Sequence, residues 1–144
     1  MKTRSLLIAG VILALFAAAC SSAGGREASG SLNTADDLIA ALEGQGFSVA
    51  NGEQIDQAFF SVPARLLNTS ETGFQVFEYP EEAAAQVDAD LVAPDGSSVG
   101  TSMPFWVDDP HFYHSGKLIV LYLGSDQSIL TALEAILGPQ FAGR

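Results

Sequence analysis

Two histidines and two carboxylates stand close together in the second half of the chain. Asp108, Asp109, His111 and His114 fall within one short segment, and the two histidines are the only ones in the sequence. A zinc site needs three or four such groups that converge on one point. Residues 108–110 (Asp-Asp-Pro) are also an ordinary turn sequence, and on an extended segment His111 and His114 point to opposite faces. The cluster therefore defines only our alternative hypothesis, a metal-binding protein or a metal-dependent enzyme.

Aromatic side chains concentrate in the same region. Phe105, Trp106, Phe112 and Tyr113 surround the predicted turn, and we expect a strand before it and a strand after it. On such a hairpin, aromatic rings can grip a small ligand, a glycan or a partner protein. Rings of this kind are also common core residues. These four residues are our candidate binding residues.

Other reactive residue types point to structure rather than to catalysis. A serine nucleophile needs an adjacent base, and only the two histidines could serve as one. The acidic pairs at 36–37 and 81–82 fall at predicted helix starts, where carboxylates stabilise the helix dipole. We therefore assign no catalytic residue and no cofactor, and we expect a protein that is not an enzyme.

The N-terminal twenty residues form three blocks. Lys2 and Arg4 give a positive start, residues 5–16 are almost entirely apolar, and small residues lead to Cys20. The apolar run is shorter than the roughly 20 residues that a spanning helix needs. A positive start, a short apolar core and small residues at the end are the features of a secretory signal peptide.

This N-terminus resembles the lipobox of bacterial lipoproteins. Small residues come directly before Cys20, although the family most often has leucine three residues before the cysteine and this chain has Ala17 there. The resemblance implies cleavage after Ala19 and a diacylglyceryl group on the thiol of Cys20, usually with a further acyl chain on the new amino terminus. Cys20 is the only cysteine, so the mature chain has no disulfide.

Charge excludes one class of partner. Removing Lys2 and Arg4 leaves four basic residues against 17 acidic ones, a net charge of −13. Such a chain is repelled by nucleic-acid phosphates, so no nucleic-acid partner is expected. It is also repelled by anionic headgroups, so the covalent lipid must hold it to the membrane.

Three helices are predicted from apolar periodicity and caps. The first spans Ala35–Glu43 and begins at Thr34 with a capping-box variant. The second spans Glu81–Leu91, with Ala84, Val87 and Leu91 as its apolar stripe. The third spans Asp126–Leu137, is capped by Ser125, and buries residues 129, 130, 133, 136 and 137.

Strands are predicted between these helices. Phe47–Ala50 is a short candidate, and Phe59–Leu67 is expected to pair with Phe74–Tyr79. Val99–Val107 should turn into Phe112–His114. Residues 117–123 (KLIVLYL) are apolar on both faces, which is typical of a central strand.

The expected architecture is a small two-layer α+β domain, an antiparallel sheet with helices packed on one face. Residues 1–19 are the signal peptide, 20–31 the lipidated Cys20 and a flexible Gly/Ser linker, and 32–144 the domain. The helix starts recur after 46 and 45 residues, which indicates either a tandem α-β-β repeat or the usual rhythm of a small α+β chain.

Four longer stretches also resemble an uncharacterised group of small bacterial envelope lipoproteins: FFSVPARLL, QVFEYPEEAA, APDGSSVGTSM and PHFYHSGKLIVLYLG. This resemblance brings no activity with it. The sequence therefore predicts a non-catalytic binding domain with a protein or small ligand as partner, held by lipid to an extracytoplasmic membrane surface. That surface is the outer membrane in a cell with two membranes, and otherwise the outer face of the plasma membrane.

Overall fold

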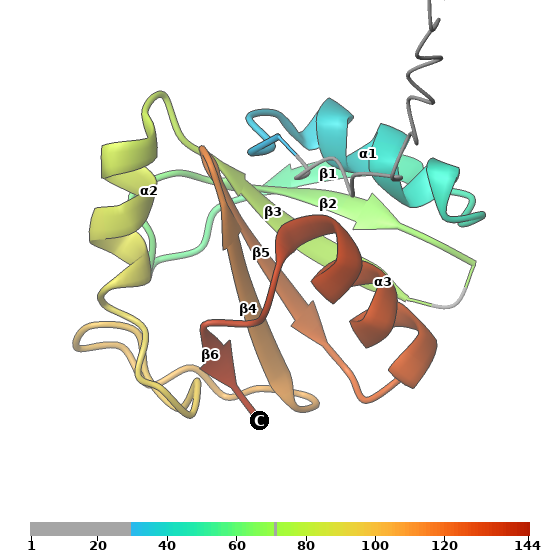
Figure 1. The fold of residues 1–144 in the computed structure, drawn as a ribbon. Coiled ribbons are helices and arrows are strands. Elements are labelled where there is room, and N and C mark those ends of the chain that lie inside the picture. The colour runs from blue at the N-terminus through green and yellow to red at the C-terminus, as the bar shows by residue number, and fades with distance from the viewer. Residues whose placement is uncertain (1–29, 71) are drawn as a thin grey trace, which may run out of the picture.

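The computed structural model describes residues 30–70 and 72–144, which form three α-helices and a six-stranded sheet (Figure 1). The predicted signal peptide and most of the predicted linker lie outside these residues. The elements in chain order are α1 (Ala35–Gly44), β1 (Ala50–Ile55), β2 (Ala64–Asn68), β3 (Gly73–Glu78), α2 (Glu82–Ala89), β4 (Pro110–Ser115), β5 (Leu118–Leu123), α3 (Gln127–Leu137) and β6 (Ala142–Gly143).

The strands are antiparallel throughout and lie in the order β1-β2-β3-β5-β4-β6. Val120 of β5 pairs with Val76 of β3 on one side and with Tyr113 of β4 on the other. Leu118 to Tyr122 are all buried. The predicted central strand and the predicted α+β class are both confirmed.

One face of the sheet is covered by α1 and α3. Side chains of Leu118, Val120 and Tyr122 join a core cluster with Leu38 and Leu42 of α1 and with Ile129, Leu133, Ile136 and Leu137 of α3. Successive strand residues point to opposite faces, so the intervening residues of β5 face the other way. The two helices that cover this face also contact each other.

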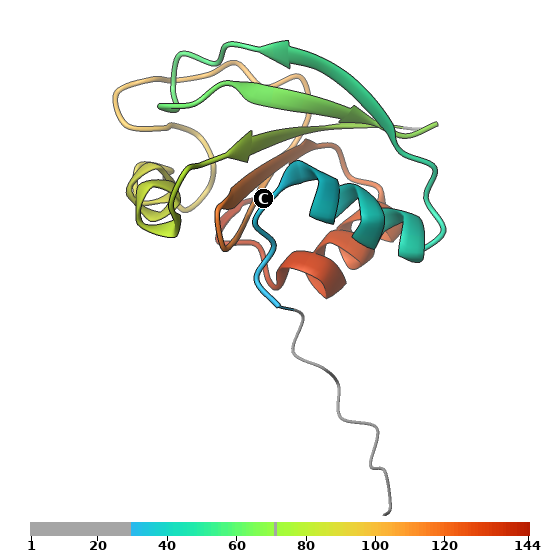
Figure 2. The same ribbon diagram turned by 90° about the horizontal axis from the view of Figure 1, so that it is seen from above.

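The opposite face is covered by α2 and by the long segment that follows it. Ile119 and Leu121 of β5 pack there with Ala85 and Ala89 of α2 and with Phe112 of β4. Seen from above, α2 stands apart from the α1–α3 pair (Figure 2). The predicted placement of all helices on one face is therefore corrected, because a strand that is apolar on both faces needs a cover on both.

Local signals located the helix starts well. Thr34 accepts a hydrogen bond from the Asp37 amide and Asp37 accepts one from the Thr34 amide, which confirms the capping box. The first residue of α2 is Glu82, with Glu81 as N-cap. The N-cap of α3 is Asp126 rather than Ser125, because the Asp126 carboxylate accepts from the amides of Ser128 and Ile129.

The predicted apolar stripe of α2 is wrong. Val87 and Leu91 are 64% and 45% exposed, whereas the buried residues of this helix are Ala85, Asp88 and Ala89. Small side chains let the helix approach the sheet closely, and the larger apolar ones were left outside. Hydrophobicity alone therefore selected the wrong face of α2.

Two strand predictions also need correction. The strand predicted over Phe47–Ala50 in fact runs from Ala50 to Ile55 as β1. Its sequence (ANGEQI) is polar, largely exposed and without apolar alternation, so no apolar pattern marks it as a strand. Residues 59–63 form a turn, and β2 begins directly after Pro63, which has no amide to donate. The predicted pairing of this strand with the next one is confirmed by the β2–β3 register.

The tandem repeat does not extend to the helices. The β2–β3 and β4–β5 hairpins meet through β3 and β5, and a twofold axis perpendicular to the sheet relates such a pair of hairpins. A rotation about that axis leaves each face of the sheet on the same side, so equivalent helices of a repeat would cover the same face. However, α1 and α2 lie on opposite faces. Any duplication is therefore limited to the strands.

The chain enters the domain at the β4–β5 turn. The Leu32 amide donates to Ser115 Oγ at 3.2 Å, and the Lys117 amide donates to the Leu32 carbonyl at 3.2 Å. Gly116 has a φ of +56°, and a Cβ there would collide with the Leu32 carbonyl oxygen. In the part of the chain that is described, no helix is long and apolar enough to cross a membrane.

Packing of α3 on the sheet should dominate stability. Leu133 is fully buried, so Leu133→Ala should lower the free energy of unfolding by about 2–4 kcal/mol. Leu130→Ala on the same helix is the control, because Leu130 is only partly buried and should cost less. Urea unfolding of the soluble domain measures both, and equal losses would contradict this packing.

Candidate functional site

The two histidines do not form a common site. The His111 ring is buried, its Nδ1 lies 2.7 Å from Gln140 Oε1, and it stacks on Tyr122. His114 lies on the opposite face of β4, with Nε2 3.1 Å from the Gly116 carbonyl oxygen. Their divergence confirms the expectation for an extended segment.

The neighbouring carboxylates do not complete a metal site either. Asp108 accepts a hydrogen bond from the amide of Asp109, and a carboxylate oxygen of Asp109 lies 4.0 Å from Arg144. Within residues 30–70 and 72–144, no three His, Cys, Asp or Glu side chains are placed to share a metal ion. No geometric feature favours the alternative metal hypothesis.

The four aromatic candidates separate into two pairs. Phe112 and Tyr113 are core residues on opposite faces of β4. Trp106 is partly buried, and Phe105 is 98% exposed. The predicted strand over Val99–Val107 is wrong: these residues form an irregular loop before β4, so the expected aromatic hairpin does not exist.

The most unusual surface feature is the segment 102–107, which we call the apolar loop. Its residues Met103, Phe105 and Val107 are 85%, 98% and 86% exposed. The other large apolar residues counted as exposed in the described chain are Val87, Leu91 and Phe141, and none exceeds 64%. Single exposed apolar residues are normal, but three at alternate positions of one short segment with this exposure are characteristic of a binding surface.

Trp106 holds the apolar loop against the domain. Its Nε1 donates to the Gly96 carbonyl at 2.7 Å, and its ring makes edge contacts with Phe59 and Phe112 at centroid distances of 5.7 and 5.9 Å. Because Trp106 points inward, the residues on either side of it point outward. The anchored Trp106 side chain therefore leaves Phe105 and Val107 exposed to solvent.

A groove of about 550 Å³ runs beside the apolar loop. Phe59, Gln75 and Leu123 line one wall, and the loop from Ser102 to Val107 lines the other. Gln57 donates to Gln75 at 2.7 Å within the same lining. The volume is typical of a small-molecule or side-chain pocket, so the exposed residues border a hollow surface.

Acidic residues border the end of this surface that leads into β4. Asp108 and Asp109 follow the loop directly, and Asp95 lies on the turn beside the tryptophan's partner Gly96. Hydrogen bonds from Ser97 lower the pKa of Asp95, so its carboxylate stays charged well below neutral pH. Arg144 is the one basic residue lining the adjoining hollow of about 370 Å³. The apolar loop therefore has a predominantly negative rim.

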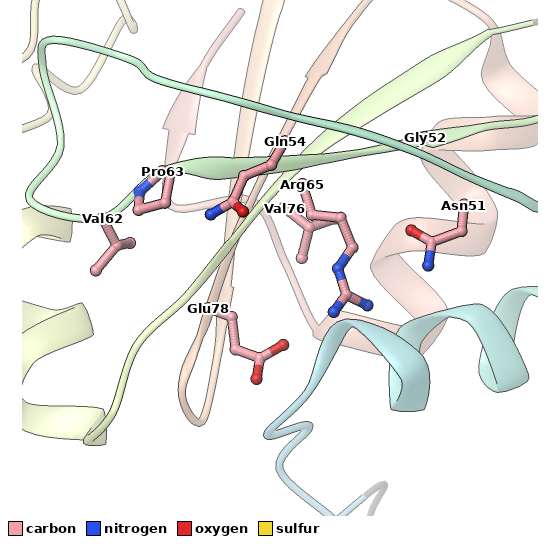
Figure 3. A pocket seen from close by; sticks show the side chains of 8 residues that line it. All are labelled: Asn51, Gly52, Gln54, Val62, Pro63, Arg65, Val76 and Glu78. Atoms are coloured by element: carbon pink, nitrogen blue, oxygen red, sulfur yellow. The ribbon is translucent and has the colours of Figure 1, made fainter.

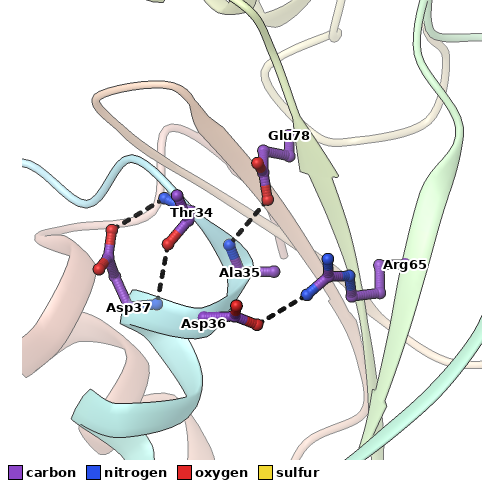
Figure 4. Close-up of polar contacts among 6 residues, drawn as sticks. All are labelled: Thr34, Ala35, Asp36, Asp37, Arg65 and Glu78. Carbon is purple, nitrogen blue, oxygen red and sulfur yellow. Dashed lines mark hydrogen bonds and ion pairs between the residues drawn. The ribbon is translucent and has the colours of Figure 1, made fainter.

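A second cavity, of about 420 Å³, lies at the start of α1 (Figure 3). Its charged lining residues already have partners: Arg65 pairs with Asp36 at 2.9 Å, and Glu78 accepts from the Ala35 amide at 3.0 Å (Figure 4). These contacts fasten α1 to β2 and β3. We assign this cavity a structural role.

Asp88 is the buried carboxylate of the domain. A single oxygen, Oδ2, accepts three hydrogen bonds of 2.7 Å, from the Ser61 amide, the Ser61 hydroxyl and the Tyr79 hydroxyl. Burial is the main cause of the raised pKa of Tyr79, and its hydrogen bond to Asp88 raises the pKa further. The phenol therefore stays protonated and keeps donating to Asp88. The network ties α2 to β3 and to the turn before β2.

A Gly-x-Ser-x-Gly spacing at residues 96–100, absent from the expectations above, matches the nucleophile elbow of serine hydrolases. That motif acts on a sharp turn between a strand and a helix. Here the segment lies in the loop between α2 and β4, where Gly96 and Gly100 adopt positive φ. The required structural context is missing, so we assign it no catalytic role.

Comparisons with known proteins supply no relative: no family model, no curated protein and no solved structure matches this chain. The site must therefore be judged by its own geometry. On that basis the apolar loop with its groove and acidic rim is the candidate functional site.

Sequence reasoning found part of this site. It predicts Phe105 and Trp106 as candidate binding residues but not Met103 and Val107, and it predicts a strand over Val99–Val107 where the structure has a loop. The alternation itself was the usable signal. Asp88 was missed as a buried residue, because nothing in the sequence marks which helix face turns inward.

Removing the Asp88 carboxylate should be costly, since it leaves the buried Tyr79 hydroxyl without an acceptor and removes the acceptor of both Ser61 donors. We expect Asp88→Ala to lower the free energy of unfolding by at least about 2 kcal/mol. Asp90→Ala is the matched control on the same helix, where the residue is exposed and should change stability by about 0.5 kcal/mol or less. Thermal unfolding measures both variants. Similar losses of unfolding free energy in the two would contradict a stabilising role of the Asp88 hydrogen bonds.

Proposed function

We propose that this protein is a lipid-anchored, extracytoplasmic docking domain that binds a partner protein through the apolar loop. The observation that carries the proposal is the near-complete exposure of Met103, Phe105 and Val107. Solvated apolar side chains gain about 25 cal/mol for each Å² that a partner removes from water. A groove beside them gives that partner a shaped surface to fill.

The anchor is the second part of the proposal. Lipid on Cys20 would tether the domain through the linker up to residue 31, and the chain then enters at the β4–β5 turn. The apolar loop precedes β4 and so lies at the opposite end of this hairpin, which is about 17 Å long. This arrangement favours presentation of the loop away from the tether and toward another protein.

Charge defines the chemistry of the partner. The acidic rim and the overall negative charge favour a partner whose apolar contact surface is bordered by lysine or arginine. The same charges oppose insertion into a bilayer that contains anionic lipid. We therefore propose a protein partner with a basic rim rather than the membrane surface.

The anchor can be tested directly. Mass spectrometry of the mature protein should show an acylated N-terminal Cys20, and Cys20→Ser should leave the precursor uncleaved or release the protein from membranes. Recovery of a cleaved, soluble wild-type protein with a free thiol would overturn this part of the proposal.

The docking surface can be tested with side-chain variants. A photo-crosslinking amino acid at position 101, beside the loop, should give a defined crosslinked product in the native envelope. Phe105→Ser combined with Val107→Ser should reduce that product at least tenfold, because the exposed apolar area is lost while the fold is kept. Val87→Ser, at an exposed apolar residue on α2, is the control and should leave it unchanged.

Two results would contradict the docking proposal. One is an equal decrease in the amount of crosslinked product in the Phe105→Ser, Val107→Ser double variant and in the Val87→Ser control. The other is binding of the lipid-free domain to vesicles through Phe105, since that would make the bilayer the target of the loop.

A further inference from the structure

The apolar loop has the side-chain alternation of a β-strand without being part of the sheet. Residues 101, 103, 105 and 107 are exposed, whereas 102, 104 and 106 are partly buried. A period of two is the mark of an extended chain with two faces. Residues 103–106 therefore alternate as in a strand, and the chain bends at residues 107 and 108.

After Ser102, which pairs with Val99, the backbone of this loop is unpaired. No amide and no carbonyl oxygen of residues 103–108 forms a hydrogen bond within the described part of the chain. Pro104 has no amide to donate. In an extended chain the amides of residues 103, 105 and 107 point to one edge and those of residues 104 and 106 to the other. The edge of residues 103, 105 and 107 is therefore the one with a full set of donors and acceptors.

We infer that the partner binds by adding an extended peptide segment as a β-strand along the edge formed by residues 103, 105 and 107. This inference rests on the proposed function and specifies its mode. Strand addition supplies main-chain hydrogen bonds for affinity and leaves alternate side chains to give specificity. Met103, Phe105 and Val107 share one face, so the added strand lays its apolar residues beside them.

Charge again selects the composition of the added strand. The loop ends in Asp108 and Asp109, and the basic residue near it, Arg144, is already close to Asp109. An alternating peptide with apolar residues on one face and lysine or arginine on the other meets both the apolar face and the acidic rim. An acidic peptide of the same pattern meets the same apolar face but is repelled by the rim.

The probe is a seven-residue peptide of alternating lysine and valine with blocked ends, and its charge control replaces lysine with glutamate. Amide hydrogen exchange of the lipid-free domain, followed by NMR, reports each position separately. The lysine peptide should slow exchange at residues 103, 105 and 107 and leave residue 106 unchanged. The glutamate peptide should protect these amides less at equal concentration.

A backbone substitution separates strand pairing from side-chain docking. An ester in place of the amide at Phe105 removes one donor but keeps the phenyl ring, and it should weaken binding of the lysine peptide about 2- to 13-fold, as loss of one hydrogen bond predicts. The same exchange at Trp106 is the matched control: it removes an amide that faces the other edge and only weakens the Phe105 carbonyl as an acceptor, so it should reduce binding less than the Phe105 ester.

The outcomes distinguish the two proposals. If the Phe105 ester binds like wild type while Phe105→Ser abolishes binding, docking stands and strand addition is overturned. If neither change affects the crosslink to the native partner, the docking proposal itself fails. Absence of protection at residues 103, 105 and 107 with the lysine peptide also overturns strand addition.

Discussion

Strand β5 buries side chains on both faces of the sheet, and the positions of the other elements depend on that burial. Val120 faces the α1–α3 layer, while Ile119 and Leu121 face α2. Exposing either face of a strand this apolar would cost roughly 1.5–3 kcal/mol for each large side chain. The chain therefore needs two covering layers, and a sequence with a single cysteine offers no disulfide within the chain as a substitute. Three helices alone cover this sheet incompletely, and the long segment between α2 and β4 completes the second layer.

The second layer explains why a polar residue is buried in α2 while large apolar residues are exposed in the apolar loop. Alanines bring α2 close to the sheet, and this close approach buries Asp88, which Ser61 and Tyr79 compensate with hydrogen bonds. Trp106 then closes the layer by packing on Phe59 and Phe112. Because its neighbours in an extended segment must point the other way, Phe105 and Val107 become exposed. The candidate binding surface is thus a geometric consequence of the way the core is closed.

The arrangement also places the proposed attachment and the proposed docking surface at opposite ends of one hairpin. The chain enters beside Gly116 at one end of the β4–β5 hairpin, and the apolar loop lies at the other end. A tether at one end and an apolar, acid-rimmed surface at the other suit a domain that is held on a membrane while it engages a protein partner. The exposed side chains Met103, Phe105 and Val107 contribute little to the core, so the proposed docking surface can change without loss of the fold.

The sequence by itself determined the local features: the Thr34 capping box, the helix over residues 127–137, the central β5 strand and the α+β class. Each depends on near neighbours in the chain, through capping hydrogen bonds or a regular apolar period. Tertiary structure alone decided that α2 turns Asp88 inward and Val87 outward, that polar β1 joins the edge of the sheet, and that the backbone of residues 103–107 remains unpaired. In these cases local preference is weak or points the other way, because small residues, polar edge strands and alternating loops carry little periodic signal. Their positions follow from which surface of the sheet remained to be covered, and that is a property of the whole fold.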